Sequence, residues 1–160
     1  MSVMIAAFMR GVTRLNDVIG RWVALLIFAM FAFLLLEVGF RYLFNSPTVW
    51  TNELTQMLFG IYAVMSGGYI MAHVNVDLLH SHLRPRKRAA LDILTSLVFF
   101  IFTLALLWFG IDMAQESMSS WETSYSAWNP PIWPVKLAIP IGTALLVLQG
   151  LVKLLEDIAV

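Results

Sequence analysis

Glu37 and Arg41 are ionisable residues beside a long apolar stretch, and such groups indicate a functional site when they lie at membrane depth. They are four residues apart with the acid first, so on a helix they share a face in the order that favours an ion pair. A pair within one helix, with Arg41 reaching toward lipid headgroups, is one interpretation. A polar contact to another helix or subunit is the second. A proton relay is the third, although no further charged group continues it in the later apolar stretches.

Trp50 and Glu53 come shortly after two residues that are typical of the start of a helix. Ser46 and Pro47 are typical of a helix N-cap and first turn, so we expect the helix to begin there and to hold Glu53 within its first two turns. The helix dipole stabilises an acid at that place. The alternative is that Glu53 anchors a second helix or subunit. Trp50 is typical of the aromatic belt at a membrane interface.

Small residues in the same predicted helix favour close helix packing. Ala63 and Gly67 are four residues apart, as are Gly68 and Ala72, and such pairs let a second helix backbone approach closely. Packing within the chain explains the pattern, and a partner interface is the alternative.

His73 and Asp77 are also four residues apart, and His80 and His82 follow them. Histidines are candidate haem or metal ligands, but a haem in a helical bundle normally needs ligands from facing helices. The other apolar stretches contain no histidine. We therefore expect a hydrogen-bonded helix end, with neither a metal site nor a cofactor in this chain.

The sequence holds no pattern typical of catalysis. It has no Cys, which excludes thiolate nucleophiles and Cys-ligated metals. No residues are spaced as a nucleophile and base, a phosphate loop or a metal-ligand cluster. Ten basic and ten acidic residues give a pI near 6.8, whereas nucleic-acid binding needs a basic face. We expect neither an enzyme nor a nucleic-acid-binding protein.

The composition predicts that membrane-spanning helices position these residues. Of the 160 residues, 60% are apolar and 12% are charged, against about half and about a quarter in soluble domains. Four uncharged stretches can each be extended to the roughly 20 residues that cross a bilayer. The predicted transmembrane helices are 19–40, 50–71, 89–110 and 134–155.

The N-terminal segment has a different pattern. Phe8, Val12 and Leu15 recur at helical spacing with charged residues between them, which is typical of an amphipathic helix lying on a membrane surface. We expect this surface helix at residues 3–18. The predicted fold is therefore all-α, with a single membrane domain over residues 1–160. It is an integral membrane four-helix bundle with an N-terminal amphipathic interfacial helix.

The basic residues predict how the chain is oriented. Three Arg precede the first apolar stretch and four Lys or Arg lie in the connection 80–88, whereas residues 115–133 contain none. By the positive-inside rule, both termini and the 80–88 loop are cytoplasmic. The 115–133 loop then faces the opposite side and presents Trp121, Glu122 and Trp128.

Four short runs of residues resemble one family. They are Arg41-Tyr42-Leu43-Phe44-Asn45-Ser46, Trp50-Thr51-Asn52-Glu53-Leu54, His73-Val74-Asn75-Val76-Asp77 and Ile139-Pro140-Ile141-Gly142. Their order within residues 15–155, together with four predicted spans, is similar to that of the DctQ-like small membrane subunit of tripartite ATP-independent periplasmic (TRAP) transporters.

This resemblance implies a sodium-coupled transporter in a bacterial inner membrane that imports an organic acid, such as a C4-dicarboxylate or sialic acid. Its other parts are a large membrane subunit, which binds sodium and substrate, and a periplasmic substrate-binding protein. The small subunit widens the fixed scaffold, in contact with membrane lipids, and helps to receive the binding protein. The candidate residues for the large-subunit interface are Glu37, Arg41, Trp50, Glu53, Ala63, Gly67, Gly68, His73 and Asp77. The candidates for binding-protein docking, on the then periplasmic 115–133 loop, are Trp121, Glu122 and Trp128.

Two other functions stay open at this point. One is a haem-bearing membrane anchor subunit of a respiratory complex, which requires inward-facing histidines on two helices. The other is a self-sufficient small exporter with Glu37 as its proton site.

Overall fold

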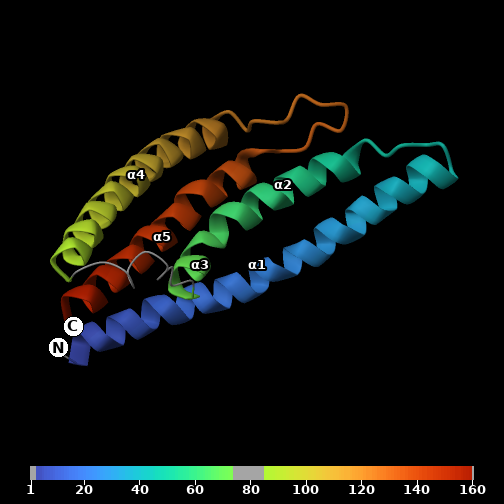
Figure 1. Cartoon of the computed structure of the whole chain (residues 1–160). Helices are drawn as coiled ribbons and strands as arrows, with labels where there is room; N and C mark the ends of the chain where they lie inside the picture. The colour runs from blue at the N-terminus through green and yellow to red at the C-terminus, as the bar shows by residue number, and fades with distance from the viewer. Residues whose placement is uncertain (1–2, 74–84, 160) are drawn as a thin grey trace.

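The computed structural model describes the backbone of residues 3–73 and 85–159, which forms a bundle of α-helices (Figure 1). α5 lies between α4 and the α2–α3 pair, and α1 lies on the other side of that pair. α5 contacts each of the other four helices. The helices are α1 (Val3–Leu43), α2 (Trp50–Met65), α3 (Gly67–His73), α4 (Pro85–Ser119) and α5 (Trp133–Ala159). The all-α class and the helical membrane bundle predicted from the sequence are confirmed.

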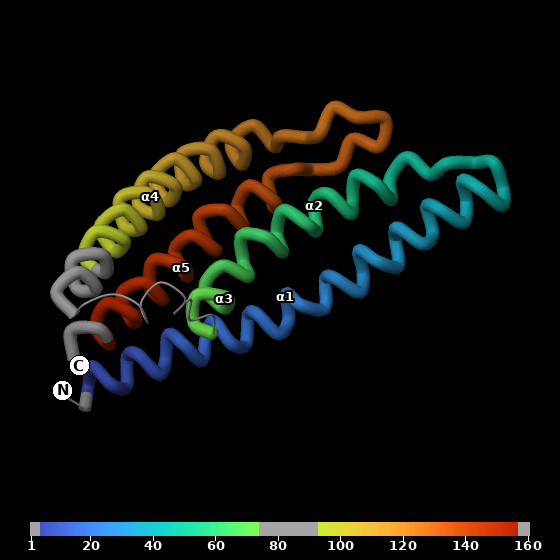
Figure 2. The backbone as a smooth tube through the Cα atoms, viewed as in Figure 1, coloured from blue at the N-terminus to red at the C-terminus, as the bar shows by residue number. Residues whose placement is uncertain are grey.

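Three helices of the described chain are long and apolar enough to cross a membrane: Met4–Leu43, Ile93–Ser119 and Trp133–Glu156. α2 and α3 meet that test together and make a fourth span when the bent pair is taken as one. The connections α1–α2 and α4–α5 lie at one end of the bundle, and the start of α1 and the last turns of α5 lie at the other (Figure 2).

The predicted helix 50–71 is divided in the structure. α2 and α3 meet at Ser66 with a bend of 42°, and the glycine pair that follows Ser66 is a common cause of such a bend. The backbone ladder continues through it, because the Ser66 N–H donates to Tyr62 O and the Ile70 N–H donates to Ser66 O. The bend therefore leaves neither of these two Ser66 backbone groups unpaired.

The N-terminal segment differs from its expected arrangement. Residues 3–18 continue without interruption into the first predicted span, so α1 is about 60 Å long. Met9 and Val12 are buried against Val152 of α5, whereas Phe8 is exposed. The buried face of α1 recurs at spacings of three, four or seven residues: Met9, Val12, Asn16, Gly20, Val23, Met30 and Glu37. The N-terminal part of this face packs inside the bundle because α5 covers Met9 and Val12, and α2 and α3 cover its later part. The sequence pattern did not reveal these neighbours.

The other connections also differ in extent from those predicted. α4 begins at Pro85, inside the predicted 80–88 loop, and residues 80–84 lie outside the described part. α4 continues to Ser119, so only residues 120–132 of the predicted 115–133 loop connect it to α5.

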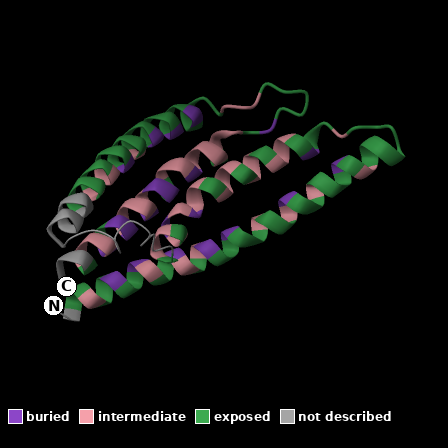
Figure 3. Ribbon diagram, in the orientation of Figure 1, coloured by how far each residue is buried: buried purple, intermediate pink, exposed green. Residues whose placement is uncertain are grey.

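Few large side chains are fully buried, and the exposed surface is strongly apolar (Figure 3). α4 is exposed along most of its length, including Phe102 and Trp108. Several buried side chains are polar instead: Asn16, Glu37, Thr51, Ser66, Thr103, Ser117, Thr143 and Gln149. This inside-out distribution is typical of helices whose outer faces contact lipid or other helices.

Candidate functional site

Glu37 lies near the end of α1 and is almost saturated with hydrogen bonds. Its Oε1 accepts from Arg41 Nη2 at 2.7 Å and from Arg41 Nε at 3.3 Å. Its Oε2 accepts from the Thr48 N–H at 3.1 Å and from the Thr51 hydroxyl at 2.7 Å, and the Thr48 hydroxyl also donates to it. Glu37 is 8% exposed. We call Glu37, Arg41, Thr48 and Thr51 the polar junction.

The polar junction combines two of the interpretations that the sequence left open. Glu37 and Arg41 form an ion pair within α1, and Arg41 is exposed along its side chain. Glu37 also contacts the connection to α2 and the first turn of α2 through Thr48 and Thr51. The two threonines were not predicted as partners, because hydroxyls near a helix start are common and their sequence separation from Glu37 carries no signal.

The start of α2 corrects a prediction. Ser46 and Pro47 were expected to cap and begin this helix, but its first residue is Trp50 and its N-cap is Val49, which makes no side-chain cap. The prediction was wrong because the carboxylate of Glu37, from a different helix, accepts hydrogen bonds beside this helix end. A negative charge there is also favoured by the helix dipole.

The loop 120–132 packs over the first turn of α2. The Ser126 hydroxyl donates to Glu53 Oε2 at 2.7 Å. The rings of Trp50 and Trp128 are 6.5 Å apart, and Trp50 also meets the Phe33 ring edge-on at 5.8 Å. Glu53 therefore lies in the first turn of α2. It also contacts another element, the loop 120–132, of the same chain.

The loop holds its shape through internal hydrogen bonds. The Tyr125 N–H donates to Asn129 Oδ1 at 3.0 Å, and the Asn129 N–H donates to Ser126 Oγ at 2.9 Å. Trp121, Tyr125 and Asn129 all have positive φ angles, which residues other than glycine adopt rarely. Trp121 stacks edge-on against Trp133 and remains exposed, as does Tyr125. The loop thus presents aromatic side chains on a defined backbone.

Glu122 ties this loop to the first turn of α5. Its Oε2 accepts from Lys136 Nζ at 2.5 Å. The hydrogen bond from the Lys136 ammonium holds the pKa of the Glu122 carboxyl below its ordinary value. As a docking candidate, Glu122 is already paired within the chain, whereas Trp121 and Trp128 keep exposed surface.

His73 ends α3 and contacts Tyr69 and Asp17. Its Nδ1 lies 2.9 Å from the Tyr69 carbonyl oxygen, and its Nε2 lies 3.2 Å from Asp17 Oδ1 on α1. Asp77, the predicted partner, lies outside the described residues, as do His80 and His82. No cluster of His, Asp and Glu able to hold a metal ion occurs in the described part of the chain.

The small residues of α2 and α3 face three different surroundings. Gly68 is buried against Asn16 of α1, where a Cβ would lie 2.2 Å from Oδ1. Gly67 faces Leu146 of α5 at a wider distance of 3.6 Å. Ala63 is exposed. Close packing within the chain therefore accounts for Gly68, and Ala63 stays available to a partner.

Asn16 and Gln149 form a buried contact that motif reasoning missed. Asn16 Nδ2 donates to Gln149 Oε1 at 3.0 Å and thereby joins α1 to α5. Asn16 was predicted on the surface helix and no partner for it was expected. The available signal was the spacing of four and seven residues that places Asn16 on one face with Val12 and Met9.

A family model described as "Tripartite ATP-independent periplasmic transporters, DctQ component" matches residues 30–160. The chain belongs to the DctQ family. No curated protein gives a significant match to the chain. As a DctQ component, the chain is a transmembrane transport protein. Members of this family are components of transporters rather than enzymes.

Three of the runs that resemble the DctQ family, 41–46, 50–54 and 139–142, lie at contacts between helices in the described chain. Residues 41–46 and 50–54 meet at the polar junction, and the second run also supplies Glu53 to the loop contact. In the run 139–142, Gly142 touches the α2–α3 bend: a Cβ there would lie 2.8 Å from the Val64 carbonyl oxygen. In this DctQ protein, the described parts of the family pattern thus join helices to each other.

Proposed function

We propose that this DctQ protein is the small scaffold subunit of a sodium-coupled TRAP transporter. It acts with a large membrane subunit and a periplasmic substrate-binding protein to import an organic acid, such as a C4-dicarboxylate or sialic acid. The large subunit binds sodium and substrate, and this chain binds neither. The family match supports the transport role, and the arrangement of buried polar groups supports the scaffold role.

The observation that carries the proposal is that polar side chains inside the bundle join helices of the same chain. Asn16 binds Gln149, and Glu37 binds Thr51. A carrier of the broken-helix type instead frees backbone groups and half-helix ends near the bilayer midplane to bind ions. At the α2–α3 bend, the two backbone groups of Ser66 are paired and Gly142 of α5 packs against the bend. A rigid scaffold fits this arrangement better than an autonomous carrier.

The proposed orientation places both termini in the cytoplasm and the loop 120–132 in the periplasm. The two ends of the bundle support it. The start of α1, whose sequence includes Arg10 and Arg14, lies at one end, whereas the loop and the α1–α2 connection lie together at the other (Figure 2). The basic end is the cytoplasmic one under the positive-inside rule. The membrane is the inner membrane, since a periplasmic binding protein must meet the other face.

The loop 120–132 is the proposed contact with the binding protein. Exposed Trp121, Tyr125 and Trp128 offer aromatic surface, which is enriched where proteins bind each other. The Ser126–Glu53 and Lys136–Glu122 contacts fix the loop to two helices, so binding would cost little loop ordering.

Reconstitution tests the proposed function. The chain is expressed with its genomic neighbours, tagged, purified in detergent and placed in vesicles with an imposed sodium gradient and a panel of labelled organic acids. We expect a large multi-helix membrane protein to co-purify in about equal amount, and uptake to need both membrane subunits, the binding protein and sodium. Uptake by this chain alone, or its purification without a large partner, would contradict the proposal.

A further inference from the structure

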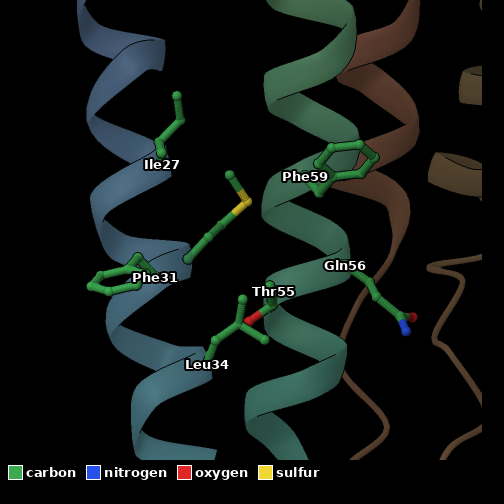
Figure 4. A pocket seen from close by; sticks show the side chains of 7 residues that line it. Ile27, Phe31, Leu34, Thr55, Gln56 and Phe59 are labelled. Atoms are coloured by element: carbon green, nitrogen blue, oxygen red, sulfur yellow. The ribbon is translucent and has the colours of Figure 1, made fainter.

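A groove about 450 Å³ in volume opens between α1 and α2 on the outer face of the bundle (Figure 4). Ile27 and Phe31 of α1 lie on one side, and Phe59 and Gln56 of α2 lie on the other. A whole helix is about 10 Å wide or more, so the groove admits side chains of a helix lying across it. The groove is lined by Ile27, Met30, Phe31, Leu34, Thr55, Gln56 and Phe59.

Gln56 is the unusual residue of this groove. The other polar lining residue, Thr55, donates its hydroxyl to the Thr51 carbonyl at 2.8 Å and needs no outside partner. Gln56 is exposed and makes no hydrogen bond to any described residue of the chain. Figure 4 shows its amide on the side of α2 that is turned away from α1.

The depth of Gln56 in the membrane makes this lack of a partner costly. Trp50 is at the start of α2 and Gln56 is six residues further on, or about 9 Å along the helix. Because tryptophans gather at the headgroup level, Gln56 lies within the hydrocarbon region. An acyl chain cannot accept or donate a hydrogen bond there, and an unpaired amide in hydrocarbon costs several kcal/mol.

The same face of α2 suits the close approach of a helix. Gln56, Phe59 and Ala63 are three and four residues apart, and all three are exposed. Ala63 lets a neighbouring backbone come near, while Phe59 provides apolar contact beside the groove. The outer face of α4 is different, since its exposed residues between Leu97 and Ile111 are all apolar, as is suitable for lipid.

We propose that the groove and the Gln56–Phe59–Ala63 stripe form one surface that binds a transmembrane helix of the large subunit, with a hydrogen-bonding side chain of that helix paired to the Gln56 amide. This inference rests on the proposed function, which supplies the large subunit as the membrane partner. The polar junction lies next to this surface, because Leu34 and Thr55 are each one turn from Glu37 and Thr51. The junction therefore holds α1 and α2 at the separation that forms the groove.

Site-directed photo-crosslinking tests the surface in the intact complex. The variants Phe59→p-benzoylphenylalanine and Phe31→p-benzoylphenylalanine place the probe at the groove. Phe102→p-benzoylphenylalanine and Phe109→p-benzoylphenylalanine are matched controls on α4, with aromatic side chains of similar exposure: 59% for both groove residues, 65% for Phe102 and 67% for Phe109. Crosslinked products are identified by mass spectrometry after irradiation of membranes.

We expect crosslinks to the large subunit from both groove positions and from neither α4 position. Crosslinks from the groove only to lipid or to a second copy of this chain would overturn the inference, as would crosslinks to the large subunit from α4 alone. These failures differ from failure of the proposed function, in which the wild-type chain recovers no large membrane partner.

A second experiment tests the amide itself. Gln56→Leu replaces the side chain that carries the amide with an apolar side chain. Gln115→Leu is the control, at an exposed position of α4. We expect Gln56→Leu to lower recovery of the large subunit about three- to tenfold, as for other hydrogen bonds between membrane helices. The isolated Gln56→Leu chain should unfold at the wild-type temperature, since Gln56 makes no hydrogen bond to the described chain. Recovery equal to wild type in Gln56→Leu would overturn the proposed pairing.

Discussion

Single residues of this DctQ protein set the position of one helix relative to the next. The carboxylate of Glu37 accepts hydrogen bonds from Arg41 in its own helix, from Thr48 in the connection to α2 and from Thr51 in the first turn of α2. A buried carboxylate is tolerated only with such partners. The polar junction is therefore a structural device that fixes the α1–α2 separation, and the groove proposed as a partner surface depends on it.

Thr51→Val should weaken this junction. The substitution keeps the side-chain shape but removes the hydroxyl that donates to Glu37 at 2.7 Å, so we expect the free energy of unfolding to fall by about 1–2 kcal/mol. Thr55→Val is the control, because its hydroxyl bonds only to the carbonyl one turn earlier in α2. Unfolding in mixed micelles, followed by circular dichroism, measures both. Equal effects of the two substitutions would contradict the role given to Thr51.

The Glu122–Lys136 pair should make stability depend on pH. The folded pKa of Glu122 is lowered from its ordinary value of 4.5, chiefly by the hydrogen bond from Lys136. The pair therefore contributes fully above about pH 4.5, and its contribution is lost as pH falls through the lowered folded pKa. Melting temperatures between pH 7 and pH 3 should fall less steeply in Lys136→Met than in the wild type. Parallel curves for the two proteins would be inconsistent with this linkage.

At the scale of elements, the α2–α3 bend and α5 are fitted to each other. Ser66 and the two following glycines bend the span, and Gly142 of α5 lies directly against Val64 on the preceding turn. A Cβ at position 142 would be 2.7–2.9 Å from three Val64 atoms, two of them in the backbone. This contact explains why a glycine occupies the middle of a membrane helix, where its flexibility would otherwise be unfavourable.

Gly142→Ala should therefore destabilise the bundle. The added methyl group must push α5 away from the bend, which we expect to cost about 1–3 kcal/mol of unfolding free energy. Gly39→Ala in α1 is the matched control, since a Cβ there meets nothing within 4 Å. It should be neutral or stabilising by up to about 1 kcal/mol through helix propensity. Thermal unfolding in detergent compares the stability of the two variants. The account would be contradicted if Gly39→Ala were less stable than the wild type while Gly142→Ala was as stable as the wild type.

The whole molecule is organised around α5, the last helix of the chain. α5 contacts α1, α2, α3 and α4, whereas α4 packs mainly on α5. The first and last helices are joined near the termini by the Asn16–Gln149 hydrogen bond and by Val152 against Met9 and Val12. The layered arrangement leaves broad apolar faces on α1 and α4, as expected of a subunit that meets lipid on one side and a partner on another.

Asn16→Leu and Gln149→Leu should show that the two side chains that join α1 to α5 are energetically coupled. Each single change leaves one buried amide without its partner and should lower the free energy of unfolding by about 1–3 kcal/mol. The double variant should lose less than the sum of the two, because both buried amides are then removed together. A double-mutant cycle of unfolding in mixed micelles measures the coupling. Strict additivity would mean that the hydrogen bond does not join α1 to α5.

The sequence by itself determined the class of the protein and the local pairings. Continuous apolar stretches require helices in a membrane, because each helix satisfies its own backbone hydrogen bonds there. The spacing of Glu37 and Arg41 predicted their ion pair, which is confirmed, and the short family runs agree with the DctQ match. The membrane helices and the ion pair depend on residues at most a few turns apart, so periodicity and spacing are sufficient to predict them. The family was indicated by the resemblance of the short runs.

Only the tertiary structure decided which distant groups meet. Glu37 with Thr51, Asp17 with His73 and Asn16 with Gln149 each join residues of different helices. The tertiary structure also decided which faces of the helices are buried and which stay exposed. The buried stripe of α1 and the unpaired Gln56 are recognised only once α5 and α2 are in place, because a helix pattern does not reveal which neighbour covers it. In a membrane, apolarity does not distinguish inside from outside, and so packing and polar contacts between helices carry that information.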